Sequence, residues 1–418
     1  MENAAISRRA ALALAAAVPA LSCGCAADGT SQSAPAATSG SSGTVVIADS
    51  ETAAVESPAA ETQGQTTAEA LLASMSLEQK AAQLFVCTPE QLTGVGVATQ
   101  AGATTAKALQ KIPVGGLVYF AQNITGAQQL RDMLANTRAL CLEAGAGVAP
   151  FLAVDEEGGT LVARVAKSGY FDVPVFPNMA EVGATGDPAQ AAEVGSGIGG
   201  YLADIGFNVD FAPVADVLTN PDNTAIGARS FGSDPELVAE MVAAEVEAMA
   251  ATGTIPCAKH FPGHGDTAGD SHTGAVCSER TREQIEGCEY LPFSAAIEAG
   301  APMVMMGHIE TPELAGDGLP ASLSRVMMTD ELRGALGFGG LIIADSMSMG
   351  AITESYGPAE AAVMFLQGGG DLILMPESLQ DAYDGVLTAV EAGELTEERI
   401  DESVLRILEA KERAGILA

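Results

Sequence analysis

Basic residues, tryptophan and histidine are all scarce in this sequence. The 418 residues include 19 Lys and Arg against 54 Asp and Glu, so the formal net charge is −35. Phosphate backbones repel such a chain, which argues against nucleic acid as a partner. There is no Trp, and this argues against a long polysaccharide cleft, where aromatic side chains commonly serve as stacking platforms. We interpret the excess acid as a solvated surface.

The apolar run nearest the N-terminus, at 10–21, is too short to cross a bilayer and is typical of a signal-peptide core. It follows Ser-Arg-Arg at 7–9, which resembles a twin-arginine export signal. Cys23 and Cys25 stand near a lipoprotein-type processing site, and both are candidates for lipidation. We therefore expect residues 1–25 to be a signal peptide. The exported protein would be either a cell-surface lipoprotein, touching the membrane only through its lipid, or a secreted protein.

Residues 26–66 differ in composition from the rest of the chain. Ser, Thr, Ala, Gly and Pro dominate, with scattered acids and no Lys or Arg. Such a segment cannot bury enough apolar area to offset the entropy lost on ordering. We expect a flexible linker here, followed by one folded domain over 67–418.

Cysteine usage gives no disulfide framework. Apart from the two near the N-terminus, the cysteines are odd in number, widely spaced and without a Cys-x-x-Cys pair: Cys87, Cys141, Cys257, Cys277 and Cys288. Most are expected to be buried small apolar residues. A single Cys277–Cys288 bridge stays open.

Downstream of the linker, strand-like and helix-like segments alternate. Apolar runs typical of strands buried on both faces occur at 84–87, 116–120, 151–154, 207–211, 255–258, 303–306, 341–344 and 372–375. Helical patterns lie between them, for example at 127–143, 188–205, 235–252, 282–299 and 358–367. Eight strands alternating with helices predict an α/β fold, a single (β/α)8 TIM-like barrel. A doubly wound sheet is the alternative.

Three of the four histidines fall in one segment, at His260, His264 and His272, directly after an apolar strand. Interspersed Pro and Gly exclude a regular helix, so the segment is a loop at the C-terminal end of a strand, where barrel enzymes place their active sites. Three interpretations are open. The polar residues only solvate a loop; they form a zinc site together with Asp266; or the Asp270 carboxylate orients the His272 imidazole for proton transfer.

Charged residues also follow other predicted strands. Asp345 ends the run 341–344 and is either a helix N-cap or the carboxylate needed for glycosyl transfer through a covalent intermediate. Asp155 is followed by two Glu and two Gly, a pattern that suits a metal, sugar hydroxyls or a capped turn. Arg229 stands in a stretch poor in bases and either forms a structural ion pair or donates to sugar hydroxyls.

The run Lys-His-Phe-Pro-Gly-His-Gly-Asp-Thr at 259–267, with Asp-Ser-His at 270–272, resembles the signature of glycoside hydrolase family 3, β-N-acetylglucosaminidase branch. The resemblance continues in order across the domain. It includes Asp-Glu-Glu-Gly-Gly at 155–159, Phe-Ala-Pro-Val-Ala-Asp at 211–216, Arg-Ser-Phe-Gly at 229–232, Ala-Asp-Ser-Met-Ser-Met at 344–349 and Gly-Asp-Leu-Ile-Leu-Met-Pro at 370–376.

The resemblance implies roles for individual residues. Asp345 matches the family's nucleophile, His272 its general acid/base, and Asp270 the dyad partner of that histidine. Residues that match sugar-binding positions are Asp155, Arg229, Lys259, His260 and Arg164, the last with one extra residue between it and Asp155. Glucosidases of the family take a carboxylic acid from a second domain instead of an Asp-x-His loop, so the loop favours the aminosugar branch.

We therefore expect a retaining, exo-acting β-N-acetylhexosaminidase that removes terminal β-linked N-acetylglucosamine from cell-wall or similar glycans, with no cofactor and no metal. A β-glycoside phosphorylase, for which a neutral histidine would tolerate incoming phosphate, or a β-glucosidase of the same family is the alternative within the resemblance. A sugar-binding lipoprotein and a zinc hydrolase are alternatives outside it. The expected partner is a carbohydrate, and the oligomeric state stays open.

Overall fold

The computed structural model of the chain describes residues 66–269, 271 and 274–417. In this part of the chain, eight parallel strands form one sheet in the order β11-β9-β7-β6-β3-β2-β1-β12. Their bounds are β1 Phe85–Cys87, β2 Gly116–Tyr119, β3 Phe151–Val154, β6 Val209–Asp210, β7 Ile255–Phe261, β9 Met303–Met306, β11 Leu341–Ala344 and β12 Ile373–Leu374. Each of the eight predicted strand segments overlaps one of them.

The two edges of this sheet meet and close it. Ile343 on β11 forms a parallel bridge with Leu372, which directly precedes β12. The Ala344 N–H donates a 3.0 Å hydrogen bond to the Leu372 carbonyl at the same junction. The predicted (β/α)8 TIM-like barrel is therefore confirmed.

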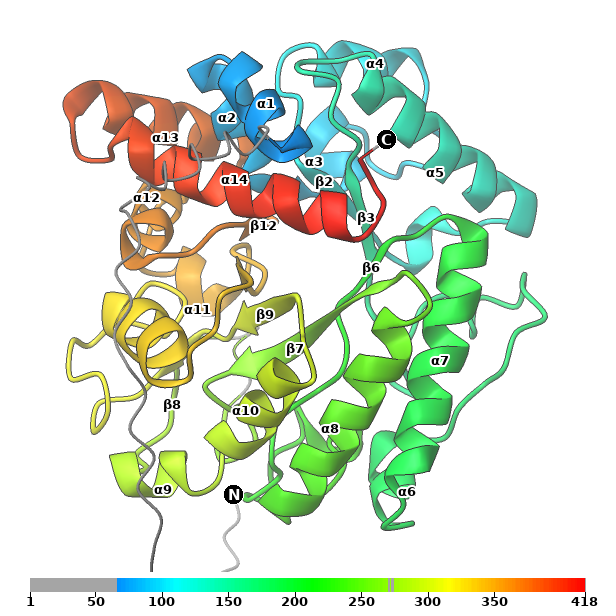
Figure 1. Ribbon diagram of the computed structural model, residues 1–418, viewed down its shortest axis with the longest axis vertical. Coiled ribbons are helices and arrows are strands. Elements are labelled where there is room, and N and C mark those ends of the chain that lie inside the picture. The colour runs from blue at the N-terminus through cyan, green and yellow to red at the C-terminus, as the bar shows by residue number, and fades with distance from the viewer. Residues whose placement is uncertain (1–65, 270, 272–273, 418) are drawn as a thin grey trace, which may run out of the picture. The chain divides into compact units, whose positions relative to one another are not determined.

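Helices surround the barrel and account for the apolar character of its strands (Figure 1). Every residue of β2, β3, β9 and β11 is buried, and so are all seven of β7. One face of each strand fills the barrel interior while the other packs beneath a helix, so neither face needs polar side chains.

The helices are numbered along the chain. Their bounds are α1 Thr67–Ser74, α2 Leu77–Gln83, α3 Pro89–Thr93, α4 Ala103–Leu109, α5 Ala127–Leu142, α6 Met179–Gly183, α7 Pro188–Ile205, α8 Pro235–Ala250, α9 Arg282–Glu286, α10 Tyr290–Glu298, α11 Gly350–Thr353, α12 Pro358–Gly368, α13 Leu379–Ala392 and α14 Glu397–Arg413. Shorter turns lie at η1 Ala121–Asn123 and η2 Gly227–Arg229, and a π-helical segment at η3 Val326–Ala335.

Local sequence signals set the ends of the long helices. Helix α7 starts with Pro188 directly after Asp187, whose side chain accepts a hydrogen bond from the Ala189 N–H. Proline suits the first turn because its missing N–H has no helical partner there. The helix ends at Gly206, which has a φ of 118° that a side chain would disfavour.

The helix predicted over 282–299 is wrong as a single element. The structure divides it into α9, which ends at Glu286 with Gly287 as its C-cap, and α10. Pro292 explains the break, because a proline is tolerated in the first turn of α10 but not in the interior of a longer helix. The strand predicted at 255–258 is longer than expected, since β7 continues to Phe261 and includes Lys259 and His260.

Two short two-stranded sheets extend the loops beyond the barrel. The hairpin of β4 (Glu156–Gly158) and β5 (Val162–Ala163) follows β3, and β8 (Val276–Cys277) pairs in parallel with β10 (Ile309–Glu310). They give defined positions to loops that leave the C-terminal ends of the barrel strands, where the predicted site residues lie.

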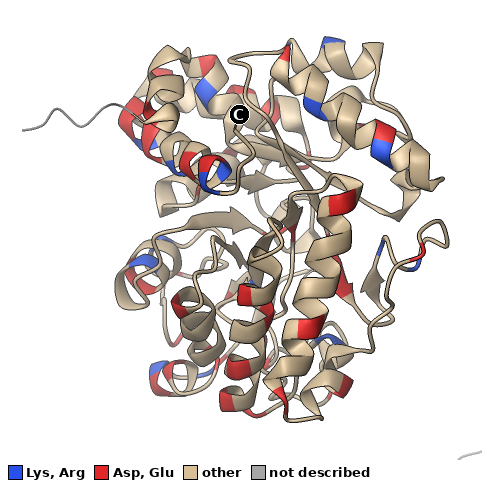
Figure 2. Ribbon diagram, turned by 45° about the vertical axis from the view of Figure 1, so that its right-hand side comes forward, with Lys and Arg blue, Asp and Glu red and all other residues tan. Residues whose placement is uncertain are grey.

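The two ends of the described chain pack together. Helix α14 contacts α1 and α2, and Figure 1 shows this red helix beside the blue ones. Asp and Glu are spread over the helices in Figure 2 rather than gathered on one face, in keeping with a solvated acidic surface. In the described part of the chain, no helix is both long enough and apolar enough to span a membrane.

Candidate active site

A cavity of about 400 Å³ lies at the C-terminal ends of the strands. Asp155 follows β3, Lys259 and His260 lie in β7, and Asp345 follows β11. Parallel strands end on the same side of a barrel, so residues far apart in sequence meet there. The cavity is lined by Val118, Phe120, Asp155, Glu157, Val162, Arg164, Phe211, Arg229, Lys259, His260, Met305, Asp345, Ser346, Ser348, Met349, Leu374 and Met375.

The structure brings six predicted site residues to this one cavity: Asp345, Asp155, Arg164, Arg229, Lys259 and His260. The predicted dyad, Asp270 and His272, lies outside the described residues. The lipidation candidates Cys23 and Cys25 also lie outside them. The roles of these four residues therefore stay predictions.

Glu157 connects the two principal cations of the cavity. Arg229 donates from Nε and Nη2 to its two oxygens, each at 2.7 Å. Lys259 Nζ lies 2.6 Å from Glu157 Oε1 and 2.8 Å from Asp155 Oδ1. The bidentate pairing fixes the guanidinium plane, and the shared carboxylate places the ammonium beside it.

These pairings keep the groups charged. Burial works to raise the pKa of Glu157, but Lys259 and Arg229 hold it well below its usual range. Burial works to lower the pKa of Lys259, but Asp155 and Glu157 raise it above its usual value. The wall of the cavity thus presents a fixed array of charges to the polar groups of a ligand.

A second buried carboxylate, Asp216, orients two histidines. Its Oδ2 lies 2.8 Å from His260 Nδ1, and its Oδ1 accepts a 2.7 Å hydrogen bond from the His264 N–H. Burial opposes ionisation of Asp216, yet the two histidines lower its pKa. His264 is itself buried, which lowers its pKa and favours the neutral ring. With Nδ1 held by Asp216, the His260 ring has a fixed orientation in the cavity wall.

Asp345 is partly buried at the cavity and stays ionised. Its Oδ1 accepts a 2.7 Å hydrogen bond from the Ser346 N–H. Burial works to raise its pKa, but His260, His308, this hydrogen bond and Lys259 together hold it below the usual value. An ionised carboxylate with a fixed orientation is the form in which Asp acts as a nucleophile. Its side chain accepts from the next residue and also lines the cavity.

His308 supports the segment that carries Asp345. Its Nε2 lies 2.9 Å from the Ser346 carbonyl, and its Nδ1 lies 2.6 Å from Ser322 Oγ. A carbonyl only accepts, so the His308 Nε2 carries a proton and donates to the Ser346 carbonyl. The histidine thereby fixes the backbone directly after the nucleophile candidate.

Arg164 reaches the cavity despite the extra residue that separates it from Asp155. Its guanidinium carbon lies 5.8 Å from the centre of the Phe120 ring. Its buried Nε has no hydrogen-bond partner among the described residues. Glu156 folds the turn that presents it, because its carboxylate accepts hydrogen bonds from the N–H groups of Val165 and Ala166.

The described residues contain no group of three or more His, Cys, Asp or Glu that is arranged to hold a metal ion. Two members of the zinc interpretation bond to protein partners instead. His260 pairs with Asp216, and Asp266 accepts a 3.1 Å hydrogen bond from Ser278 Oγ. The described part of the loop is therefore arranged by protein hydrogen bonds.

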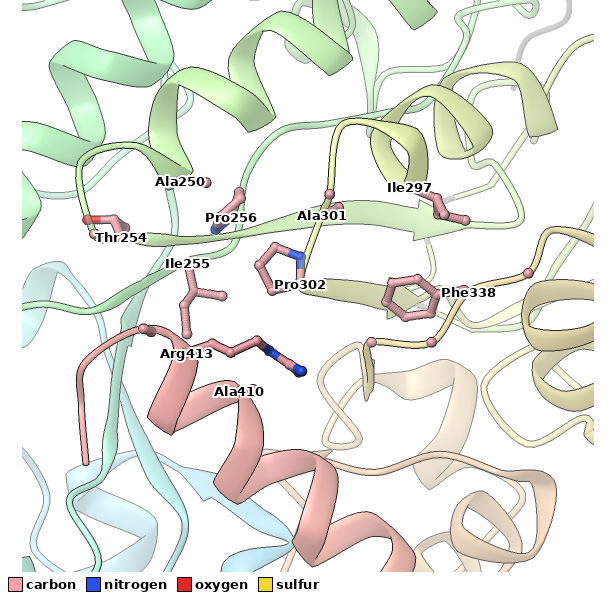
Figure 3. A pocket seen from close by; sticks show the side chains of 16 residues that line it. Ala250, Thr254, Ile255, Pro256, Ile297, Ala301, Pro302, Phe338, Ala410 and Arg413 are labelled. Carbon is pink, nitrogen blue, oxygen red and sulfur yellow. The ribbon is translucent and has the colours of Figure 1, made fainter. Parts of the chain in front are cut away.

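A larger cavity, of about 660 Å³, lies at the opposite end of the barrel (Figure 3). It lies between the segments that precede β7, β9 and β11 and the end of α14. Figure 3 shows Ile255, Pro256, Pro302 and Phe338 around it, with Arg413 reaching in from α14. Arg413 is the one titratable side chain of its lining, so volume alone does not identify the site of chemistry.

All five cysteines of the domain are free. Cys277 is exposed while Cys288 is buried, so the bridge left open between them is not formed. The other three, Cys87, Cys141 and Cys257, are buried as expected.

The glycosyl hydrolase family 3 N-terminal domain model matches residues 76–410 of the chain. The chain belongs to glycosyl hydrolase family 3. It is 33% identical over 327 residues to β-hexosaminidase A of Pseudoalteromonas piscicida, covering 72% of this chain and 54% of that protein. It is 35% identical over 276 residues to β-hexosaminidase LpqI of Mycobacterium tuberculosis, covering 64% of this chain and 70% of that protein.

Solved structures of the family share the barrel. A family 3 β-N-acetylglucosaminidase from Paenibacillus sp. str. FPU-7 superposes with a TM-score of 0.76 at 36% identity, covering 82% of this chain and 63% of that one. The chain thus spans only about half of the Pseudoalteromonas protein and under two thirds of the Paenibacillus structure.

Sequence reasoning missed residues that orient the family 3 site. Nothing in the order of residues shows that Glu157 pairs with Lys259 of β7 and Arg229 of η2. Sequence reasoning assigned no separate role to Asp216, although its position after an apolar run could have marked it as a residue at the mouth of the barrel. His264 was counted in the zinc alternative, whereas it contacts Thr267 and Ser271.

Proposed function

We propose that this family 3 protein is a retaining, exo-acting β-N-acetylhexosaminidase that hydrolyses terminal β-linked N-acetylglucosamine. The observation that carries the proposal is Asp345, an ionised and oriented carboxylate in a cavity with the Glu157-linked cations. The names of the relatives support the aminosugar substrate. A cavity of about 400 Å³ suits a terminal sugar better than a long internal segment.

In the proposed mechanism, Asp155, Arg164, Arg229, Lys259 and His260 bind the hydroxyls of the terminal sugar. Asp345 attacks the anomeric carbon while His272 protonates the departing glycosidic oxygen, which yields a glycosyl-Asp345 ester. His272 then takes a proton from water, and the hydroxide formed displaces Asp345 from the anomeric carbon. Two inversions at this carbon retain the β configuration. Asp270 acts by orienting the imidazole.

Release of 4-nitrophenol from paired aryl β-N-acetylglucosaminide and aryl β-glucoside tests the substrate class. We expect the aminosugar to be cleaved with the higher kcat/KM, and preference for the glucoside would replace this proposal with the β-glucosidase alternative. Repeating the assay with phosphate and analysing products separates hydrolysis from phosphorolysis, since sugar 1-phosphate would identify a phosphorylase. Calorimetric sugar binding without turnover would identify a sugar-binding lipoprotein.

We further propose that residues 1–25 are a signal peptide, that 26–66 are a linker, and that the domain at 67–418 acts outside the cytoplasm on cell-wall or similar glycans. The motifs around residues 7–25 support export. Metabolic labelling with a fatty acid, compared among the native chain, Cys23→Ala and Cys25→Ala, tests the lipid anchor. Loss of label in one variant identifies the anchored cysteine, and no label in the native chain favours secretion.

A further inference from the structure

Glu156 is a buried acid to which the proposed mechanism gives no role. Its two neighbours in the chain, Asp155 and Glu157, line the cavity, whereas Glu156 is fully buried and lies outside the lining. Side chains alternate between the two faces of an extended segment, so the Glu156 carboxylate lies behind the cavity wall. There it accepts a 2.8 Å hydrogen bond at Oε1 from the phenol of Tyr201 on α7. The same carboxylate also reaches the turn that follows β5.

Glu156 completes the turn that carries Arg164. The β4–β5 hairpin pairs Glu156 with Ala163, the last residue of β5. The strand ladder therefore does not extend to the N–H groups that follow Arg164. The Glu156 carboxylate binds them instead, since Oε2 accepts a 2.7 Å hydrogen bond from the Val165 N–H and Oε1 accepts a 2.9 Å one from the Ala166 N–H. A single side chain thus fixes the backbone directly after Arg164.

Glu156 is itself fixed by two other elements. Asp210, at the end of β6, is fully buried, and its Oδ1 accepts a 2.9 Å hydrogen bond from the Glu156 N–H. Burial raises the pKa of Tyr201 above its usual value, so its phenol keeps the proton that it donates to Glu156. Burial also raises the pKa of Glu156, while hydrogen bonds from the turn and from Tyr201 oppose that rise. A carboxylate that accepts three hydrogen bonds has little freedom to rotate.

The two arginines of the cavity are held in different ways. Arg229 donates two 2.7 Å hydrogen bonds to Glu157, which fix its guanidinium directly. The Arg164 guanidinium carbon lies 5.8 Å from the centre of the Phe120 ring, and its buried Nε has no hydrogen-bond partner among the described residues. The place of Arg164 in the cavity wall therefore depends on its backbone, which Glu156 fixes.

We propose that Glu156 is a positioning residue that sets the place of Arg164 in the cavity wall. Tyr201 and Asp210 in turn hold Glu156 against α7 and β6. The inference rests on the proposed function, because it requires Arg164 to bind the sugar. A group that binds the substrate equally in the ground state and in the transition state changes KM and leaves kcat unchanged. Loss of the positioning should therefore raise KM.

Glu156→Gln tests the role with little change in side-chain size. An amide has only one acceptor oxygen, so at least one of the three donors loses its partner. We expect KM for 4-nitrophenyl β-N-acetylglucosaminide to rise roughly tenfold to a hundredfold, with kcat within about threefold of the native value. Glu193→Gln, at an exposed position of α7, is the matched control and should behave as the native chain. A fall in kcat with KM unchanged would overturn the proposal.

A double-mutant cycle separates positioning from general damage to the fold. In an Arg164→Ala background, Glu156→Gln should change kcat/KM by less than about twofold, because the residue through which it acts is gone. In an Arg229→Ala background it should keep its full effect, since Glu157 orients that guanidinium. Equal losses in the two backgrounds would indicate a merely structural role. That result, or a native-like Arg164→Ala enzyme, would overturn the inference.

Tyr201→Phe provides a second variant if Glu156→Gln does not fold, as judged by urea unfolding. It keeps the ring and removes only the hydroxyl that holds Glu156. We expect KM to rise by about threefold to tenfold, and the rise should again disappear in the Arg164→Ala background. A native KM would contradict the proposal. Preference of the native chain for an aryl β-glucoside would overturn the proposed function, and the same cycle on that glucoside would still test the positioning role.

Discussion

Two buried carboxylates at opposite ends of the barrel gather cations in this acidic protein. At the C-terminal end, Glu157 pairs with Arg229 and Lys259. At the N-terminal end, Asp371 lies two residues before β12, and its oxygens lie 2.6 Å from Arg333 Nη2 and 3.0 Å from Arg406 Nη1. Asp371 is fully buried and also accepts a 2.7 Å hydrogen bond from Ser403 Oγ. The two clusters use the same chemistry.

The clusters differ in what their cations face. Arg229 and Lys259 line the cavity that holds Asp345. Arg333 instead donates from Nη1 to the carbonyls of Phe338 and Gly340, at 3.1 and 3.0 Å, and so ties the segment before β11 to Asp371. The comparison shows that buried ion clusters with the same chemistry differ in whether their cations can reach a ligand: only Arg229 and Lys259 border the cavity that holds Asp345. In a TIM barrel, the N-terminal end serves stability and the C-terminal end serves function.

The largest expected effect is on the reaction itself. Asp345→Ala removes the proposed nucleophile, so we expect hydrolysis of an aryl β-N-acetylglucosaminide to fall by at least about a thousandfold. The free energy of unfolding should fall at neutral pH, because the lowered pKa of Asp345 means that the folded protein stabilises this charge. Asp330→Ala, which changes an exposed aspartate of η3, is the control and should stay native in both assays. Substantial turnover by Asp345→Ala would remove this residue from the mechanism.

At the other end of the barrel, Asp371→Asn should affect stability alone. It leaves Arg333 and Arg406 without their buried counter-charge, and breaking such a pair costs about 3–5 kcal/mol in the free energy of unfolding. Urea unfolding measures this loss, and kcat/KM of the folded enzyme should stay unchanged. Asp384→Asn, at an exposed position of α13, supplies the matched control. A loss of kcat/KM without a loss of stability would reverse the assignment of the two ends.

Glu157→Gln should lower both the free energy of unfolding and kcat/KM, because Glu157 is a buried ion-pair partner and its cations face the cavity. We expect kcat/KM to fall roughly tenfold to a hundredfold, mainly through KM, because Lys259 and Arg229 lose the charge that orients them. Steady-state kinetics beside urea unfolding measures both effects, with exposed Glu247→Gln on α8 as control. If only stability changed, Glu157 would be equivalent to Asp371 and the comparison would fail.

Lys411 on α14, at the N-terminal end of the barrel, should make the free energy of unfolding depend on pH. Its Nζ is fully buried and donates to Gln83 Oε1 and to the Gly115 carbonyl, at 3.1 and 2.9 Å. Burial lowers the pKa of Lys411 from 10.5 to about 7. Between these values the unfolded chain binds the extra proton, so the free energy of unfolding should rise with pH.

The rise amounts to at most about 1.4 kcal/mol for each pH unit above 7. Urea unfolding at pH 7, 8 and 9 should show it in the native chain and in the control Lys107→Met, which changes an exposed lysine. Lys411→Met should lack this contribution. Parallel curves for all three proteins would show that Lys411 is not desolvated as the structure indicates, and activity should not follow the same trend.

The strands were predictable from the sequence because parallel strands buried on both faces leave apolar runs. Pro292 was a local signal for a helix start near residue 290, but the helical periodicity over 282–299 favoured a single helix instead. No local sequence signal predicts that the sheet closes between Ile343 and Leu372, because closure depends on two distant strands meeting in space. Local position singled out Asp345, Asp155 and Arg229 as candidates, and the family resemblance then implied roles for all six predicted cavity residues. The pairing of Glu157 with Lys259 and Arg229 was not predictable from the sequence, because it requires three distant segments to be brought together by the fold.

The account rests on Asp345 as the nucleophile at the functional end of the barrel. Incubation with a 5-fluoro N-acetylglucosaminyl fluoride, which slows hydrolysis of a covalent intermediate, followed by peptide mass spectrometry, tests this most directly. We predict one glycosyl adduct per chain, located on the peptide that contains Asp345 and absent from Asp345→Ala. An adduct on another carboxylate, with Asp345 unmodified, would contradict the account.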